Sequence, residues 1–84
     1  MRTVDEVRPI IESIFRNLSN KPGVISHMST KDMLYRVAIE TPDKQIFIAE
    51  ISRKDIDDYF EDYNKKEAKK NIELALQSAP PKNG

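Results

Sequence analysis

Hydrophobic residues recur every three or four positions near the start of the chain, which is the pattern of an amphipathic helix. Between Thr3 and Leu18 they are Val4, Val7, Ile10, Ile11, Ile14, Phe15 and Leu18. Thr3 and Glu6 have the spacing of a capping box, but Pro9 disfavours a helix interior, so a start nearer Asp5 or Glu6 is an equal alternative. The Ser-Asn-Lys-Pro-Gly cluster at 19–23 predicts the end of this helix.

Two β-rich segments, Met33 to Thr41 and Gln45 to Ile51, predict a hairpin. Because the fixed φ of Pro42 excludes the two-residue turns that hairpins favour, we expect a three-residue loop of Pro42, Asp43 and Lys44. Pairing Thr41 with Gln45 then creates one face that is entirely apolar and places Arg36 opposite Glu50 on the other face. The apolar face, which we expect to meet the first helix, contains Tyr35, Val37, Ile39, Phe47, Ala49 and Ile51.

A further strand before the hairpin is one of two alternatives. Val24, Ile25 and Met28 allow a short strand, which would make the sheet three-stranded. The run soon ends in the polar residues 29–32, so a hairpin without this strand is the other alternative.

After Ile51 the hydrophobic period changes from 2 to 3.6 residues, which predicts helices. Ser52 and Asp55 have the form of an N-cap and its N3 acid, so a helix should begin at about Arg53, with core-facing Ile56, Tyr59, Phe60 and Tyr63. Asn64, with Glu67 three residues later, resembles another N-cap and precedes a new apolar stripe of Ala68, Ile72, Ala75, Leu76 and Ala79. This stripe belongs either to a third helix or to a kinked continuation of the second.

The sequence therefore predicts an α+β fold with an N-terminal helix, an antiparallel β-hairpin or three-stranded sheet, and one or two C-terminal helices. We expect a single domain over residues 1–79 and a disordered tail over residues 80–84, which read Pro-Pro-Lys-Asn-Gly.

Length and composition restrict the function. A chain of 84 residues buries only about 60–65% of its unfolded surface, which leaves no room for a deep, walled active site. The absence of cysteine removes disulfides, thiolate zinc sites and thiol catalysis, and indicates a reducing or an indifferent compartment. We expect a cytoplasmic protein. No apolar run approaches the ~18 residues of a membrane span, so we expect no membrane partner.

Candidate catalytic and metal-binding residues are few. His27 is the single histidine and has no local hydroxyl and acid to form a catalytic group, so we interpret it as a surface residue. Four acids at 57, 58, 61 and 62 follow neither an EF-hand nor a His-carboxylate spacing and fit a solvated helix face. Gly23 and Gly84 are the two glycines, so there is no phosphate-binding loop. We expect no enzymatic activity, no cofactor and no metal.

The order of the charges is more informative than their total. The 14 basic and 14 acidic side chains cancel, yet five acids and no base occur between Asp55 and Asp62. Four lysines follow at once and lie within a ~140° arc of one helix face: Lys65, Lys66, Lys69 and Lys70. The first turns of a helix disfavour cations, so one explanation is a bound anion such as phosphate. The other is a solvated face with ordinary i, i+4 pairs such as Glu61 with Lys65 and Asp62 with Lys66.

Residues 64–76, NKKEAKKNIELAL, resemble the second helix of the double-stranded RNA-binding domain. That family opens the helix with Lys-Lys-x-Ala-Lys, matched by Lys65, Lys66, Ala68 and Lys69. The resemblance implies the element order helix, three antiparallel strands, helix, and lysines that contact phosphates across the RNA major groove. The loop of Pro42, Asp43 and Lys44 before Phe47 is faintly similar to the family's Gly-Pro-x-His loop.

This sequence also departs from the family. The loop lacks the glycine, and Lys44 stands where the family has histidine, so recognition of the RNA minor groove does not carry over. Residues 56–63, where the family has its third strand, have the pattern of an acidic amphipathic helix. A strand there would favour the RNA-binding family, whereas a helix would leave only the lysine signature.

We therefore expect a small non-catalytic module that binds a macromolecular partner, a protein or a second copy of itself, in an interaction, regulatory or inhibitory role. The second face of the hairpin is more apolar than a solvated face needs to be and offers a partner surface of Leu34, Ala38, Ile46 and Ile48, unless another element covers it. The alternative is binding of nucleic acid, with double-stranded RNA the first candidate, through Lys65, Lys66, Lys69 and Lys70.

Overall fold

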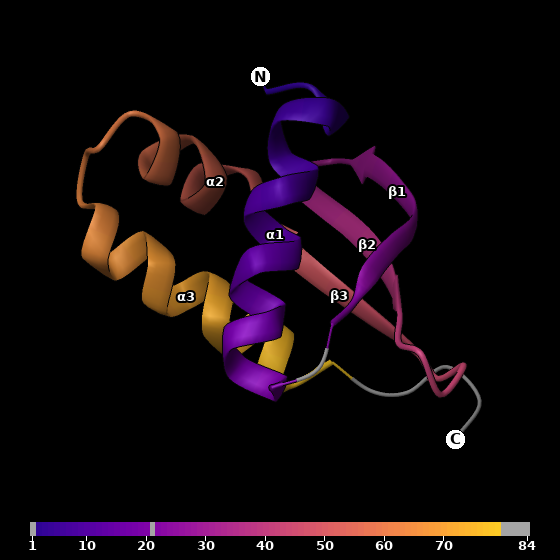
Figure 1. Cartoon of the computed structure of the whole chain (residues 1–84). Coiled ribbons are helices and arrows are strands. Elements are labelled where there is room, and N and C mark those ends of the chain that lie inside the picture. The colour runs from indigo at the N-terminus through magenta and orange to yellow at the C-terminus, as the bar shows by residue number, and fades with distance from the viewer. Residues whose placement is uncertain (1, 21, 80–84) are drawn as a thin grey trace.

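The computed structural model describes residues 2–20 and 22–79 and has the predicted α+β architecture (Figure 1). The sheet has three strands, and there are two separate C-terminal helices, so the structure decides both alternatives left open by the sequence. The elements are α1 (Val4–Ser19), β1 (Val24–Lys31), β2 (Leu34–Glu40), β3 (Ile46–Ser52), α2 (Arg53–Phe60) and α3 (Lys65–Gln77). The predicted tail at residues 80–84 lies outside the described residues.

The helices lie to one side of an antiparallel sheet with the strand order β1-β2-β3 (Figure 1). The core forms between this face and the helices, where α1 contributes Val7, Ile11, Ile14 and Phe15 and α3 contributes Ile72 and Leu76. From β2 and β3 the core receives Tyr35, Val37, Ile39, Ala49 and Ile51. The apolar face of the hairpin thus meets the stripe of the first helix, as predicted.

The register of the hairpin is also as predicted. Tyr35 pairs with Ile51, Val37 with Ala49 and Ile39 with Phe47, while Arg36 faces Glu50. The loop closes with a hydrogen bond from Lys44 N to Thr41 O at 2.9 Å, and the backbone of Lys44 is left-handed, with a φ of 66°. A turn followed by a left-handed residue is the usual form of a three-residue hairpin loop.

β1 is longer than the short strand that the sequence allowed around Val24, Ile25 and Met28, because it continues through the polar residues 29–31. In a strand that is covered on one face only, every second side chain can be polar. Ile25 is buried, whereas His27 and Lys31 are exposed and pair with Ala38 and Leu34 of β2. The pairing shifts between Ile25 and His27, which marks a β-bulge in this edge strand.

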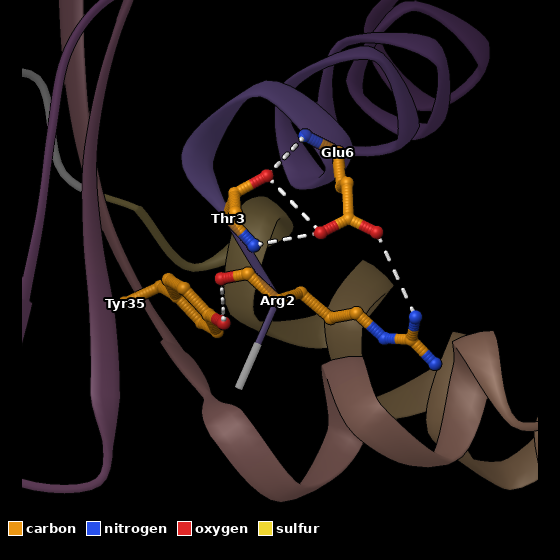
Figure 2. A network of polar contacts seen from close by, with 4 residues as sticks. All are labelled: Arg2, Thr3, Glu6 and Tyr35. Carbon is orange, nitrogen blue, oxygen red and sulfur yellow. Dashed lines mark hydrogen bonds and ion pairs between the residues drawn. The ribbon is translucent and has the colours of Figure 1, made fainter.

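The first helix begins directly after Thr3, so the earlier of the two predicted starts is correct. Thr3 Oγ1 accepts a hydrogen bond from Glu6 N, and the Glu6 carboxylate accepts one from Thr3 N at 3.0 Å, which completes the capping box (Figure 2). Arg2 lies 3.6 Å from the same carboxylate, and its carbonyl accepts a bond from Tyr35 Oη at 3.1 Å. Pro9 lies inside α1 and has no backbone N–H to donate to the helix. The helix forms nevertheless, because the capping box and the burial of its apolar stripe stabilise it.

Neutralising Glu6 should test the charge in this cap. The hydrogen bond from the Thr3 backbone, followed by that from its side chain, lowers the pKa of Glu6 below 4.5. A carboxyl with a lowered folded-state pKa stabilises the fold above its unfolded value, and this contribution is lost as the pH falls through the folded value. We expect Glu6→Gln, which keeps a hydrogen-bonding side chain, to be less stable than wild type at pH 7. The difference between their free energies of unfolding, measured by urea titration, should disappear below about pH 4.5. The control is Asp5→Asn in the same helical turn, and an identical pH dependence of both variants would contradict the prediction.

α2 begins at Arg53 as predicted, with the Ser52 side chain accepting a hydrogen bond from Lys54 N at 3.2 Å. One detail of the C-terminal prediction is wrong, and a second is confirmed only in part. Tyr63 is not a core residue, since α2 ends at Phe60 and a left-handed Asp62 turns the chain, which leaves Tyr63 69% exposed. Asn64 occupies the N-cap position of α3, as predicted, but its side chain makes no capping hydrogen bond, because its own backbone is left-handed rather than extended.

Candidate functional site

The face of the sheet opposite the helices is uncovered by any described element. On β2 and β3 its apolar side chains are Leu34, Ala38, Ile46 and Ile48, the four that the sequence selects as a partner surface. Leu34 is 37% exposed and the other three are half-buried by their neighbours in the sheet. We call these four residues the apolar strip. Neither β1 nor a helix covers it, because β1 lies beside β2 in the same sheet.

Polar residues border the apolar strip. A shallow depression on this face brings together Ile46, Ile48 and Ala38 with Ser26, His27 and Ser29 of β1, and with Arg36. Arg36 lies opposite Glu50 across the β2–β3 pair, so these opposite charges on the hairpin's open face are adjacent, while Glu40 on the same face pairs with Ile46. The sequence prediction missed the β1 contribution to this surface, because simple alternation places His27 on the same face as buried Ile25, and the bulge between the two residues moves His27 to the uncovered face.

The four lysines lie on the exposed side of α3, away from the core residues Ala68, Ile72 and Leu76. Within the described chain none of Lys65, Lys66, Lys69 and Lys70 forms an ion pair. Glu61 and Asp62 precede α3 in a turn, so their predicted helical pairing with Lys65 and Lys66 is wrong. Lys65 Nζ instead lies 4.9 Å from the centre of the Tyr59 ring, a cation–π contact that links α3 to α2.

The five acidic side chains of residues 55–62, which we call the acidic block, include two that contact other side chains of the protein. Asp58 forms an ion pair with Lys54 at 2.8 Å, and Asp55 accepts a hydrogen bond from Asn71 Nδ2 of α3 at 3.1 Å. The second contact joins the two C-terminal helices, as do their packed side chains. Two members of the block thus have a structural role, while Glu61 and Asp62 are exposed.

His27 is exposed, as predicted, and it lies in β1. In residues 2–20 and 22–79 no group of three or more His, Asp or Glu side chains is placed to hold a metal ion. Burial raises the pKa of Tyr35, and the nearby Asp57 raises it further, so its hydroxyl stays protonated and donates to the Arg2 carbonyl (Figure 2). Tyr35 thereby ties β2 to the start of α1, which is a structural role.

Residues 53–60 are helical, so the element at the place of the RNA-binding family's third strand is a helix, as the sequence pattern indicates. The sheet does have three strands, but the strand outside the hairpin is β1, which comes before the hairpin in the chain. Apart from α2, the chain therefore has the order helix, three antiparallel strands, helix. Among the described helices, none combines the length and the apolar character that crossing a membrane requires.

The fold and its surfaces define a small α+β module with one helix-covered and one uncovered sheet face. Comparisons with protein-family models, with curated proteins and with solved structures find no significant match to this chain. The function must therefore be inferred from its surfaces.

Proposed function

We propose that this protein is a non-catalytic interaction module that binds a protein partner through the uncovered face of its sheet. The apolar strip of Leu34, Ala38, Ile46 and Ile48 is the observation that supports this function. Hydrophobic residues scattered over a surface are ordinary, but here Ala38, Ile46 and Ile48 lie together on one regular face with polar residues beside them, and Leu34 lies on the same face beyond the Arg36–Glu50 pair. This arrangement is typical of surfaces that other proteins cover.

The chemistry of the module is consistent with a regulatory or inhibitory role. Such a role needs a stable scaffold and one accessible surface, and the helices supply the scaffold by burying the other sheet face. With no cysteine in the sequence, nothing in the module depends on an oxidising compartment, which supports a cytoplasmic location.

A photo-crosslinking amino acid at Ile48 tests this function in cells that express the protein. We expect defined adducts with a protein, whether a second copy or another chain, because Ile48 lies at the centre of the proposed surface. The matched control is the same substitution at Leu74, which is 50% exposed on α3, on the other side of the molecule from the uncovered sheet face. Equal adducts from both positions, or none from Ile48, would refute the proposed function.

The four lysines of α3, which form no ion pair within residues 2–20 and 22–79, favour a second candidate, the binding of nucleic acid. Ammonium groups without carboxylate partners are free to contact phosphates, and the signature of residues 64–76 resembles that of the double-stranded RNA-binding domain. The acidic block weighs against it, since exposed Glu61 and Asp62 directly precede the lysines and would repel phosphate.

Charge reversal distinguishes this candidate. If the lysines bind duplex RNA, Lys65→Glu with Lys66→Glu should abolish a mobility shift that wild type produces at low salt, because two phosphate contacts are lost and repulsion is added. The control, Arg8→Glu with Lys31→Glu, makes the same change in net charge at exposed positions outside α3. Absence of a shift with duplex RNA or DNA at low salt would exclude the candidate.

A further inference from the structure

β2, the central strand of the sheet, presents a base, a small apolar residue and an acid on the uncovered face. Residues 35, 37 and 39 are buried in the core, so by alternation Arg36, Ala38 and Glu40 project from the other face. Arg36 and Glu40 are exposed, and each lies two residues, about 7 Å, from Ala38. Two charges of opposite sign are thus equally spaced about Ala38.

Neither charge has a partner within the described chain. The two neighbours of Glu40 in the sheet, Val24 and Ile46, are both apolar. Arg36 faces Glu50 across the strand pair, but Arg36 lines the shallow depression on this face and Glu50 does not. In residues 2–20 and 22–79 no ion pair or hydrogen bond joins the side chain of Arg36 or Glu40 to another group. Both charges are therefore available to another molecule.

We propose that a second copy of this chain packs face to face on the uncovered sheet face, with the two β2 strands antiparallel. The two-fold axis lies between the sheets, perpendicular to the strands, at Ala38. A two-fold interface brings the same patch of both copies together, so the patch must complement its own rotated image. Rotation about Ala38 exchanges positions 36 and 40 and sets Arg36 of each copy opposite Glu40 of the other. This inference rests on the proposed function and identifies the partner of the same face.

The apolar side chains fit the same arrangement. Ala38 pairs with Ile48 in the sheet, and an axis that crosses both residues places each of them against its own counterpart. Ile46 lines the depression together with Ala38 and Ile48 and borders this contact. Two sheets packed face to face bury the side chains between them, so the second copy covers the uncovered face. Glu50 belongs to the edge strand β3, so its carboxylate can remain in water beside Arg36.

Other arrangements of two copies bring unfavourable contacts. An axis at Arg36 or at Glu40 would set each of these charges against its own counterpart, and so would an axis parallel to β2. An axis at Val37 would set Leu34 against Glu40, and an axis one strand position beyond Ala38 would set Ala38 against Glu40. Of these arrangements, the axis at Ala38 alone pairs opposite charges.

The size of the face predicts weak association. Its three strands of seven or eight residues cover roughly 14 × 24 Å on each copy, which is less than the ~800 Å² per partner of a standard interface. In sedimentation equilibrium we expect the average mass of the wild type to rise from 9.7 kDa toward twice that value as the concentration increases. A constant mass up to a concentration of about 1 mM would overturn the proposal.

Charge reversal tests the contact between Arg36 and Glu40. Arg36→Glu and Glu40→Arg should each weaken association about tenfold, because each places two pairs of like charges in the dimer. The double variant should restore association to within about threefold of the wild type, since it re-forms both pairs with their signs exchanged. Glu40→Arg has only apolar neighbours in the sheet, so it remains informative even if Arg36→Glu, which faces Glu50, disturbs the fold. The control is Arg8→Glu at an exposed position of α1, which should associate like the wild type. Equal association of all variants, or no restoration by the double variant, would overturn the proposal.

A single engineered cysteine tests the position of the axis, since the natural sequence has no cysteine. In Ala38→Cys the two thiols face each other across sheets about 10 Å apart, so a short bismaleimide should join two copies. The matched control is Leu34→Cys, which is exposed on the same face. Its two thiols would lie eight residues apart along the strands, roughly 27 Å, and should not be joined. Cross-linking of Ala38→Cys alone supports the arrangement, whereas equal cross-linking of both variants, or of neither, overturns it.

The failure of this inference can be distinguished from the failure of the proposed function. If two copies do not associate but the adducts from Ile48 contain another protein, the proposed function stands and only the second copy is wrong. If Ile48 gives no adducts either, both fail.

Discussion

Ile72→Ala should lower the free energy of unfolding by about 2–5 kcal/mol, the range for truncating a fully buried isoleucine. Ile72 has no exposed surface and projects from α3 into the core that α1 and the sheet share. The alanine would leave a cavity where these three elements meet, and the remaining contacts are too few to close it. Small domains have only about 5–15 kcal/mol of stability, so a large share of it depends on this side chain.

Chemical denaturation monitored by circular dichroism measures the change. Leu74→Ala is the matched control, because it removes a similar aliphatic side chain from the same helix, two residues away, at a position that is 50% exposed. We expect its effect to stay within about 0.5 kcal/mol, since surface substitutions rarely do more. Equal effects of the two variants would show that α3 does not pack on the sheet through Ile72.

The hairpin could be predicted to the residue because two independent constraints agree. Alternation along 35–39 and 47–51 specifies which side chains share a face, and Pro42 restricts the loop length. A shift by one residue would have placed Arg36 among the core side chains. The start of α1 could not be decided from the sequence, because the apolar stripe fits either predicted start and Pro9 weighs against the capping box; the structure shows that Thr3 caps the helix.

β1 could be read only in part because an edge strand needs just one apolar face. Its sequence from Ser29 to Lys31 is polar, and the bulge after Ile25 interrupts the alternation that would reveal it. Its length is determined by pairing with β2, a non-local effect. The same holds for Tyr63, which continues the helical spacing of α2 although the chain turns at Asp62.

The apolar strip was predictable as a set of residues, but its exposure was not. Alternation assigns Leu34, Ala38, Ile46 and Ile48 to one face of the hairpin, whereas the positions of the other elements decide whether that face is covered. Likewise, the lysines of α3 were evident from spacing, but the loss of their expected partners follows from a turn at 61–64.

Gly23 is the clearest case in which packing gives a residue a role that the local sequence does not reveal. In the sequence it belongs to a cluster of helix-breaking residues. In the structure it is buried between α1 and β2, and no positive φ requires a glycine there. A Cβ atom at this position would lie 2.6 Å from Phe15 Cδ2 and 2.7 Å from Ile39 Cγ2. Both distances are far below van der Waals contact. The absence of a side chain at Gly23 therefore allows the backbone to pass close to Phe15 and Ile39.

Gly23→Ala should therefore destabilise the fold by about 1–3 kcal/mol, as overpacking of a core does. Neither neighbour can easily withdraw, because Phe15 and Ile39 are both buried. For a domain of this size the midpoint of thermal unfolding should fall by about 4–8 °C per kcal/mol, which calorimetry resolves. An unchanged midpoint would mean that the backbone at Gly23 moves aside at no cost.

A second substitution tests whether the clash with Phe15 is the cause. Phe15→Leu shortens the side chain that the new Cβ atom would meet, although alone it destabilises by leaving core volume empty. If the clash is the cause, the double variant should be less destabilised than the sum of the two single variants, since each change relieves the defect of the other. Additive effects would instead assign the cost to Ile39 or to the backbone. Because Phe15 belongs to α1 and Gly23 precedes β1, a non-additive result would also show that these elements pack together as the structure describes.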